Sequence, residues 1–200
     1  MSIRVFLFPH NLWTKNIYDI SIVRNTNIYK VIGSDKMNYI CKIATLDEMN
    51  EKWDYEINNA KDKSNWLTWK KDNIERFKKK YIIPYYGILN GKIICEATAA
   101  INPSIVQNSE NLVDETTAYL MAFRTIKEYQ NQGYFSKLYK FMIEDLKSKG
   151  YKKVTLGVEP EEEKNKIIYK KYGFTNLIKT STEVYPDGTE IEVEYYSKDL

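Results

Sequence analysis

The sequence predicts a single α/β domain. Strand-like and helix-like patterns alternate along the chain from residue 38 onward. Two turn signals, Asn90-Gly91 and Asp187-Gly188, each lie between two strand-like runs and so predict antiparallel pairs. The chain has 200 residues, of which 43% are hydrophobic and 14% aromatic. This is enough for one enclosed core and is far from the composition of a disordered protein.

Residues 1–37 show little periodicity and are predicted to be an N-terminal extension of a domain formed by residues 38–200. Two origins remain open: a strand-bearing or poorly ordered arm, or translation of upstream sequence from an early start codon, since a complete domain can begin at Met37. Residues 1–36 hold five basic and two acidic residues, so the net charge of +3 lies there and the remainder is balanced. A balanced body argues against a nucleic-acid-binding protein, which presents a basic face to phosphates.

The cysteine and histidine content excludes several kinds of site. Cys41 and Cys95 form neither a disulfide framework nor a pair at metal-ligand spacing, which favours a reducing cytoplasm. The single histidine, His10, lies in the extension, so the main domain lacks Ser-His-Asp, Cys-His and histidine-metal sites unless His10 folds back. No apolar run approaches the roughly 18 residues of a membrane span. We therefore expect a cytoplasmic protein without a metal or a membrane partner.

The first half of the domain is predicted as one strand, two helices and a hairpin. Tyr39–Ala44 alternates like a strand, and Thr45-Leu46-Asp47-Glu48 has the S/T-x-x-E form of a capping box, which marks a helix start. Apolar residues recur three or four positions apart in this helix and in a second one that begins near Ser64. Asn90-Gly91 predicts a tight hairpin, because a type I′ turn needs positive φ at both central positions. Its strands are Ile82–Leu89 and Lys92–Ile101.

The second half is predicted to alternate between strand and helix and to end in another hairpin. A polar loop, residues 102–114, precedes the next strand, Thr116–Thr125. Gly150 and Gly173 follow two amphipathic runs and predict left-handed caps at helix ends. The predicted helices are Gly133–Lys149 and Pro160–Tyr172, the strand between them is Lys153–Val158, and the last strands are Phe174–Tyr185 and Thr189–Ser197.

One segment between a strand and a helix has the features of an anion site. Its sequence is Tyr129-Gln130-Asn131-Gln132-Gly133-Tyr134-Phe135-Ser136. A helix start directs unpaired N–H groups and the positive end of the helix dipole at one point, which suits a phosphate or pyrophosphate, and glycine lets the backbone approach the ligand. The alternative is ordinary turn chemistry at a helix start.

With the segments that follow it, this loop resembles the Gcn5-related N-acetyltransferase (GNAT) family. The resemblance covers roughly residues 38–200 and is most specific between Tyr119 and Phe174. Gln130-x-x-Gly133 matches the loop that binds the coenzyme A pyrophosphate, and Tyr169-x-x-x-Gly173-Phe174 matches the element that lines the thioester end of the cleft. The resemblance implies a mixed, mostly antiparallel sheet with helices on both faces, opened between the fourth and fifth strands of the domain to admit coenzyme A.

Two residues depart from the family pattern. Phe135 stands where the loop motif prefers glycine or alanine, so its side chain must point away from the phosphates or reshape the site. Glu162 stands where the family often has an asparagine, and Asn165 follows one turn later. Asn165 lies on the same helical face as Tyr169, four residues on, and is expected to take over that role.

The resemblance also implies residue roles in acetyl transfer from acetyl-CoA. Phe123-Arg124-Thr125 would lie along the pantetheine, with the backbone of Phe123 and Thr125 hydrogen-bonding it and stabilising the oxyanion. The amine would attack directly, and Tyr169 would donate toward the leaving thiolate. Because a thiol has a pKa near 8.5 and a phenol near 10, full proton transfer from a tyrosine is uphill by about 2 kcal/mol. We therefore expect Tyr169 to be first a hydrogen-bond donor; the alternative is that it only packs the helix on the sheet.

The proton acceptor is left among the carboxylates, because the domain has no histidine. A lysine-like amine with a pKa of about 10.4 needs a base, whereas an α-amino group near 7.7–8.0 is already partly free. Glu96, within an apolar strand, and Glu115, at the start of a strand, are the candidates. Either could instead be an ordinary strand carboxylate.

The predicted function is transfer of an acetyl group from acetyl-CoA to a primary amine of an unidentified small molecule, peptide or protein. No metal and no nucleic acid are implied, and a homodimer paired through the last strands is open. The first alternative is an inactive module that binds or senses coenzyme A, its catalysis lost through Phe135 and Glu162. The second is a nucleic-acid-associated protein that uses the basic arm and the run Lys78-Lys79-Lys80.

Overall fold

The computed structural model describes residues 28–31, 38–60 and 63–200. The strands are β1 (Ile28–Val31), β2 (Tyr39–Ile43), β3 (Ile82–Leu89), β4 (Lys92–Ala100), β5 (Thr117–Thr125), β6 (Lys153–Val158), β7 (Asn176–Val184) and β8 (Glu190–Asp199). The helices are α1 (Leu46–Asn59), α2 (Ser64–Lys78), α3 (Tyr134–Ser148) and α4 (Glu163–Lys171), with single 3₁₀ turns η1 (Pro103–Ile105) and η2 (Lys127–Tyr129).

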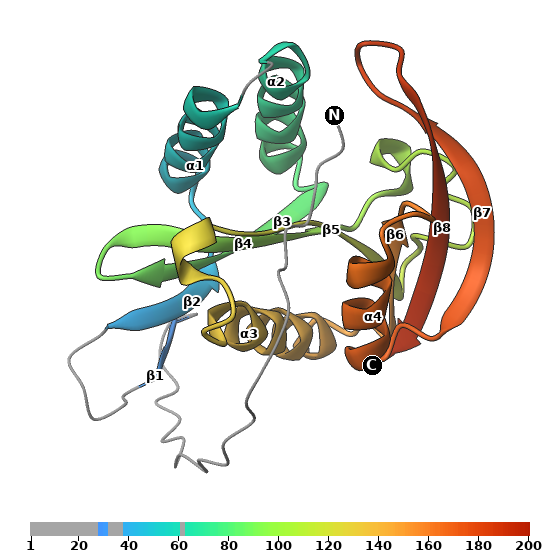
Figure 1. Ribbon diagram of the computed structural model, residues 1–200. Coiled ribbons are helices and arrows are strands. Elements are labelled where there is room, and N and C mark those ends of the chain that lie inside the picture. The colour runs from blue at the N-terminus through green and yellow to red at the C-terminus, as the bar shows by residue number, and fades with distance from the viewer. Residues whose placement is uncertain (1–27, 32–37, 61–62) are drawn as a thin grey trace.

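The described strands form one sheet in the order β1-β2-β3-β4-β5-β6-β8-β7. Helices α1 and α2 lie on one face of this sheet, and α3 and α4 lie on the other (Figure 1). Every neighbouring pair is antiparallel except β5 and β6, which run parallel. The predicted order of elements from residue 38 onward, and the mixed sheet with helices on both faces, are confirmed.

Local sequence signals account for the ends of several elements. Thr45 and Glu48 form the predicted capping box, with each side chain bonded to the other residue's backbone N–H. Asn90 and Gly91 have φ of 50° and 84°, the positive values that a type I′ turn requires. Helix α4 begins at Glu163 rather than at Pro160, because residues 159–162 form a separate turn in which the Glu162 N–H donates to the Glu159 carbonyl. The predicted start of that helix was therefore wrong by three residues.

The predicted extension lies mostly outside the described residues. Of residues 1–37, the structure describes β1, which pairs antiparallel with β2. His10 and the remainder of the extension lie outside the described part, so the division at residue 37 stays a prediction.

Two apolar layers hold the helices on the sheet. Under α3 the buried stripe is Leu138, Met142 and Leu146, all fully inaccessible and spaced four residues apart, as one helix face requires. Under α1 and α2 the layer is centred on Met49 and Trp53, which pack against β3 and β4. The sheet is thus covered by apolar side chains on both faces.

Candidate active site

The strands β5 and β6 separate beyond a short parallel ladder. Their pairing runs only from Thr117 opposite Lys153 to Leu120 opposite Leu156, although β5 continues for five more residues. Beyond Leu120 the backbone edges of the two strands face an opening rather than each other. This is the opening that the sequence predicted between the fourth and fifth strands of the domain.

A β-bulge lies on β5 at the edge of this opening. Thr98 and Glu96 on β4 pair with Met121 and Arg124, so two β5 residues, Ala122 and Phe123, lie opposite one residue of β4. Ala122 has φ of 57°, a left-handed conformation that costs an alanine about 1–2 kcal/mol. Strain of this kind clusters at functional sites.

The bulge directs side chains of β5 into both layers. The Phe123 ring packs at 5.1 Å from Phe135 of α3 and 6.1 Å from Tyr169 of α4. The guanidinium of Arg124 points to the opposite face, where it lies 4.8 Å from the ring of Trp66. Because of the extra residue, Met121 and Arg124 share a face although they are three positions apart.

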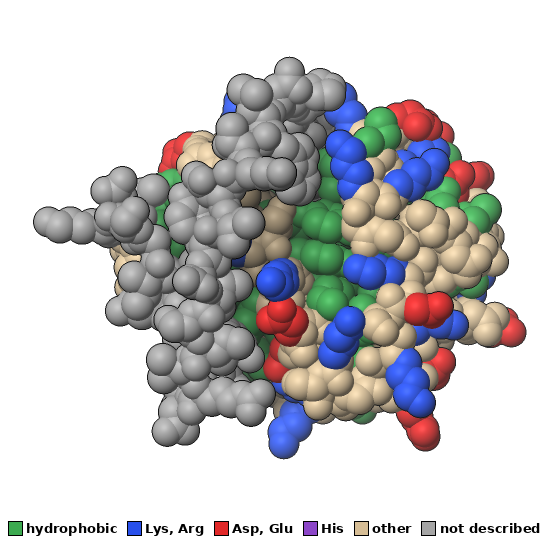
Figure 2. All heavy atoms as spheres, turned by 90° about the horizontal axis from the view of Figure 1, so that it is seen from below, with side chains coloured by type: hydrophobic (Ala, Val, Ile, Leu, Met, Phe, Trp, Pro, Cys, Tyr) green, Lys and Arg blue, Asp and Glu red, His purple; other side chains and the backbone are tan. Residues whose placement is uncertain are grey.

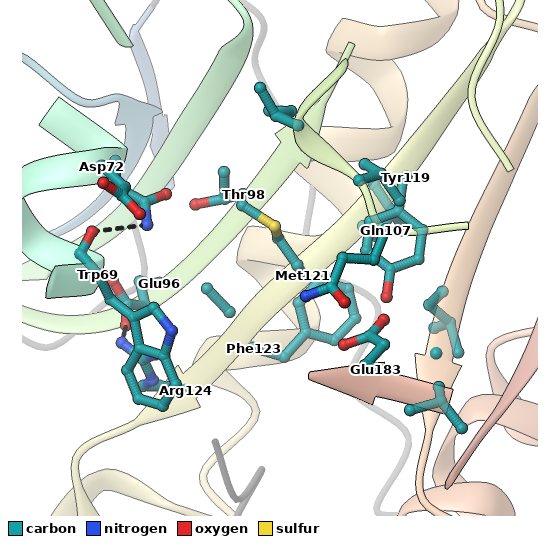
Figure 3. Close-up of a pocket in the computed structure, with 18 of the residues that line it drawn as sticks. Trp69, Asp72, Glu96, Thr98, Gln107, Tyr119, Met121, Phe123, Arg124 and Glu183 are labelled. Atoms are coloured by element: carbon teal, nitrogen blue, oxygen red, sulfur yellow. Dashed lines mark hydrogen bonds and ion pairs between the residues drawn. The ribbon is translucent and has the colours of Figure 1, made fainter. Parts of the chain in front are cut away.

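The opening leads into a cavity of about 480 Å³. Its walls come from α1, α2, the strands β3 to β8, α4 and the loop after η1, so it reaches from one face of the sheet to the other. Figure 3 shows Trp69 and Asp72 on one side of the cavity, Tyr119 and Glu183 on the other, and Met121 and Phe123 between them.

The loop before α3 has the backbone of an anion site. Helix α3 starts after Gly133, which has φ of 78°, and no side chain caps its first turn. Asn131 is also left-handed, with φ of 61°. A Cβ atom at Gly133 would meet nothing within 4 Å, so there is open space in front of the turn. The Gln130 side chain donates to the Thr125 carbonyl at 2.9 Å and holds the loop against the end of β5.

The side chains around this turn leave the anion site open. Phe135 is 7% exposed and packs inward on Phe123, so its bulk points away from the helix start. Tyr39 Oη donates to the Tyr134 carbonyl at 2.9 Å and fixes the first turn of α3 to β2. The Ser136 hydroxyl meets the Tyr172 hydroxyl at 3.1 Å. The Gln132 side-chain amide donates a hydrogen bond to the Glu128 carbonyl at 2.8 Å.

Helix α4 presents Asn165 and Tyr169 to the cavity, as expected from their spacing. They are 4% and 5% exposed, and both line the cavity. The Asn165 amide donates to the Glu162 carboxylate, so the acidic residue at the helix start is held by the asparagine one turn later. Burial, and then the charge of Glu162, raises the pKa of Tyr169 above its usual value. Tyr169 therefore keeps its proton, as a hydrogen-bond donor requires.

The two predicted bases lie in different environments. Glu96 lines the cavity but is 4% exposed and forms an ion pair with Arg124. If Glu96 accepted a proton from the amine, Arg124 would be left as a buried cation without its ionic partner. Glu115 is exposed in the loop two residues before β5 and does not line the cavity.

Glu183 lines the cavity and was not singled out in the sequence. It lies on β7, half-buried, and accepts a hydrogen bond from Tyr195 Oη at 2.7 Å. Burial raises the pKa of Glu183, and the nearby charge of Glu159 raises it further, while the hydrogen bond from Tyr195 opposes them. Neither Glu183 nor Glu159 forms an ion pair with any residue that the structure describes.

Other kinds of site receive no support from the described residues. Among residues 28–31, 38–60 and 63–200, no three His, Cys, Asp or Glu side chains group as metal ligands do. Within the same ranges, no helix is both long and apolar enough to cross a membrane.

Solved structures of N-acetyltransferases share this fold. RimL, a ribosomal L7/L12 alpha-N-protein acetyltransferase in complex with coenzyme A, matches with a TM-score of 0.59 at 12% identity, covering 81% of this chain and 94% of that chain. An N-acetyltransferase from Staphylococcus aureus Mu50 gives 0.57 at 17% identity, covering 81% and 98%. The ribosomal-protein-S18-alanine N-acetyltransferase from Escherichia coli gives 0.58 at 17%, covering 81% and 94%.

Sequence comparison identifies the family directly. No curated protein matches this chain. Residues 44–174 match the profile of the acetyltransferase (GNAT) family. This range holds the β5–β6 opening, the uncapped start of α3 and Tyr169 on α4. Because the profile spans more than half of the 200 residues, the chain belongs to the acetyltransferase (GNAT) family and is an acyl-CoA-dependent N-acetyltransferase.

Proposed function

We propose that the enzyme takes its acetyl group from acetyl-CoA, with the pyrophosphate at the first turn of α3 and the thioester in the opening between β5 and β6. The observation that carries this proposal is the continuity of the two features: β5 ends at Thr125, and the uncapped helix start follows at Gly133. Backbone N–H groups at such a turn bind phosphate oxygens. Gln130, Asn131, Gln132 and Ser136 complete the loop.

The outer surface near α3 and α4 suits a nucleotide with a long apolar arm. Figure 2 shows this side of the molecule, where hydrophobic side chains gather in a hollow that Lys and Arg side chains border. Lys137, one turn into α3, lies 5.8 Å from the centroids of both the Tyr39 and Tyr134 rings. Cationic side chains beside a helix start add to the attraction for phosphates.

The acceptor is a primary amine that enters the cavity and attacks the thioester carbonyl directly. The cavity joins the face of α1 and α2 to Tyr169 on α4, so the two substrates meet in the opening. Backbone donors near Phe123 would stabilise the oxyanion, and Tyr169 would donate toward the leaving sulfur. The acceptor belongs to a small molecule or a peptide, and we propose that the reaction takes place in the cytoplasm, where Cys41 and Cys95 stay as the free, buried thiols seen here.

Acetyl-CoA is expected to raise the unfolding temperature selectively. A ligand at about a hundred times its dissociation constant adds about 2.7 kcal/mol to the free energy of unfolding, which for a domain of this size is a shift of several degrees. Thermal unfolding with millimolar acetyl-CoA, compared with ATP and NAD, measures it. No shift, or equal shifts with all three, would overturn the assignment of the α3 loop.

The alternative of an inactive module that only binds or senses coenzyme A was based on the unusual residues Phe135 and Glu162, and the structure gives each of them a place that does not block the site. Phe135 is buried beside Phe123 and does not obstruct the loop, and Asn165 holds Glu162. Release of free thiol from acetyl-CoA in the presence of an amine distinguishes an enzyme from a sensor, since a sensor binds acetyl-CoA and releases none.

Replacing Tyr169 with phenylalanine is expected to slow acetyl transfer by about tenfold or more while leaving acetyl-CoA affinity nearly unchanged. The change removes one hydroxyl aimed at the leaving sulfur, and a charge-assisted hydrogen bond contributes about 1.5–3 kcal/mol. Thiol release gives kcat, and thermal shift gives affinity. Tyr172→Phe, which removes the hydroxyl that meets Ser136, is the matched control. An unchanged kcat would remove Tyr169 from the mechanism.

A further inference from the structure

On the acceptor side of the cavity, side chains of α2 contact side chains of the β7–β8 hairpin. Figure 1 shows these elements apart as ribbons, but their side chains meet. The Asn65 amide donates to the Asp187 carboxylate at 2.7 Å. The Trp69 and Tyr185 rings meet edge to face with centroids 5.5 Å apart. Trp69 and Tyr185 both line the cavity, so their contact forms part of its wall.

The loop after η1 is hydrogen-bonded to β7 on a second side of the same cavity. The Gln107 side chain pairs with the backbone of Val184, donating to its carbonyl at 2.8 Å and accepting from its N–H at 3.0 Å. The Asn108 amide donates to the Thr182 carbonyl at 2.9 Å. A peptide lying in extended form along this edge of β7 would have to displace these bonds. The cavity volume of about 480 Å³ falls in the usual range for small-molecule pockets, about 300–1,000 Å³.

The charges around the cavity favour a cation. Glu96 and Arg124 neutralise each other. The other charged residues of the described lining are Asp72, Glu159, Glu162 and Glu183, against Arg76. The aromatic rings of the lining include Trp53, Trp69, Tyr86, Tyr119, Tyr169 and Tyr185, whose faces attract cations. A cavity with more carboxylates than cationic side chains and with aromatic walls favours an ammonium group over an anionic or a neutral polar ligand.

On the basis of the proposed function, we infer that the acceptor is a small alkylamine that binds in this cavity as a cation, and that Glu183 receives its proton before attack. An alkylammonium with a pKa of about 10.4 is almost entirely protonated at neutral pH, so its acetylation needs a base. Glu183 is the carboxylate of the lining that is held by a hydroxyl donor, Tyr195, and carries no cationic partner.

The neighbours of Glu183 suit this exchange of a proton. Tyr195 on β8 donates to it, Glu159 after β6 lies close enough to raise its pKa, and burial raises it most. Tyr119 on β5 lies on the same side of the cavity as Glu183 (Figure 3), and burial, followed by the charge of Glu183, raises the pKa of Tyr119. Lys179 on the same strand lies 5.9 Å from the Tyr195 ring, but its ammonium donates to the carbonyls of residues 108 and 110. A raised pKa makes Glu183 a stronger base than an ordinary carboxylate.

The proton and electron balance of the reaction is complete with these groups. The ammonium gives one proton to the Glu183 carboxylate, which later passes it to solvent. The nitrogen lone pair forms a C–N bond to the acetyl carbonyl carbon, and the C–S bond breaks with its electron pair on sulfur. The nitrogen loses a second proton, and the departing sulfur takes up one proton in its place, so that coenzyme A leaves as the free thiol. Tyr169 donates its hydrogen bond to the sulfur as the charge develops.

A comparison of acceptors tests the substrate class. We expect n-butylamine and 1,4-diaminobutane to give a kcat/KM at least tenfold higher than a lysine-free hexapeptide with a free N-terminal serine, measured as thiol release at pH 7.5. Preference for the peptide, with acetyl-CoA still raising the unfolding temperature, would overturn this inference and leave the proposed function standing. Absence of any acetyl-CoA shift would remove both.

Glu183→Gln tests the base. The variant keeps the shape of the side chain but cannot take a proton, so kcat/KM for n-butylamine at pH 7 should fall about a hundredfold or more. The deficit should shrink toward pH 10, where the amine loses its own proton. The matched control is Glu192→Gln, an exposed residue of β8 outside the cavity, which should keep the wild-type profile. A constant ratio of variant to wild type at every pH would mean that Glu183 is structural.

The variant Tyr195→Phe tests the role of Glu183 as the base in a second, independent way. It removes the hydrogen bond that lowers the pKa of Glu183, so the pKa of Glu183 rises. Activity requires the ionised carboxylate, and the acid limb of kcat/KM should therefore move to higher pH than in the wild type. An acid limb at the wild-type pH would contradict the role of Glu183.

Discussion

Replacing Gly87 with alanine is expected to destabilise the protein by about 3 kcal/mol and to weaken acetyl-CoA binding as well. A Cβ at this position of β3 would lie 2.0 Å from Tyr39 Oη and 2.8 Å from Tyr39 Cζ. Tyr39 is 3% exposed, and its hydroxyl is held by the Tyr134 carbonyl. Overpacking a buried site costs about 1–3 kcal/mol or more. Because Tyr134 begins α3, a displaced Tyr39 also disturbs the helix start proposed to bind the pyrophosphate.

Urea unfolding and acetyl-CoA titration measure the two effects of Gly87→Ala. Tyr39→Phe is the control, since it removes the hydrogen bond to Tyr134 without the clash and should cost about 1 kcal/mol. The double variant should lose less than the sum of the two, because it lacks the hydroxyl that the new Cβ meets. Wild-type stability in Gly87→Ala would show that β2 and β3 can separate at this point.

Replacing Arg124 with methionine should cost about 3–5 kcal/mol of stability. Methionine fills the space of the aliphatic part of the arginine but leaves Glu96 buried without its partner, and breaking a buried ion pair from one side costs this much. The variant also loses the stacking of the guanidinium on Trp66, 4.8 Å away. Denaturant unfolding gives the change in free energy.

The double variant Glu96→Leu, Arg124→Met separates charge from packing. With both charges removed, no buried group lacks a partner, and most of the lost stability should return. Glu75→Leu, which removes one member of the exposed Glu75–Lys79 pair of α2, is the control and should stay within about 1 kcal/mol of the wild type. A double variant as unstable as Arg124→Met would place the loss in packing against Trp66 instead of in the unpaired charge.

The elements of the fold could be predicted from the sequence because their signals are local. The Asn90-Gly91 turn and the Thr45 capping box each lie within four residues, and both appear as expected. Helical spacing predicted that Asn165 and Tyr169 share one face of α4, whereas their place in the site came from the resemblance to the family. The contacts that decide what each side chain does are not local: the ion pair of Glu96 joins residues 28 positions apart, and nothing in either strand's own pattern indicates it.

The bulge on β5 shows one reason for this limit. Strict alternation along β5 would place residue 124 on the face opposite to residue 121. The extra residue, Ala122, puts Met121 and Arg124 on the same face and brings Arg124 beside Glu96. An alanine carries no signal for a left-handed conformation, because its preference is against it. The ion pair between Arg124 and Glu96, one of the two predicted bases, therefore could not be derived from the sequence.

The register of β7 and β8 shows a second reason. The predicted strands end at Tyr185 and begin again at Thr189, which leaves the three-residue loop 186–188 that the structure has, with Tyr185 bonded to Thr189. The sequence did not give the pairing of individual residues: Glu183 pairs with Ile191, whereas a two-residue turn centred on Asp187-Gly188 would pair residue 183 with residue 192. A shift of one residue moves every side chain to the other face. Only the observed register puts Glu183 on the same face as Tyr195, which lies outside the cavity lining but within hydrogen-bond distance of Glu183.

The separation of β5 and β6 also bears on the order of events at the site. The cavity crosses the sheet through this opening, with α1 and α2 on one side and α4 on the other. With acetyl-CoA placed as we propose, the amine and acetyl-CoA would approach the reacting carbonyl from opposite faces of the sheet, and neither would lie in the other's path. Either substrate could then arrive first or leave first, and direct attack would take place in a ternary complex without an acetylated enzyme as an intermediate.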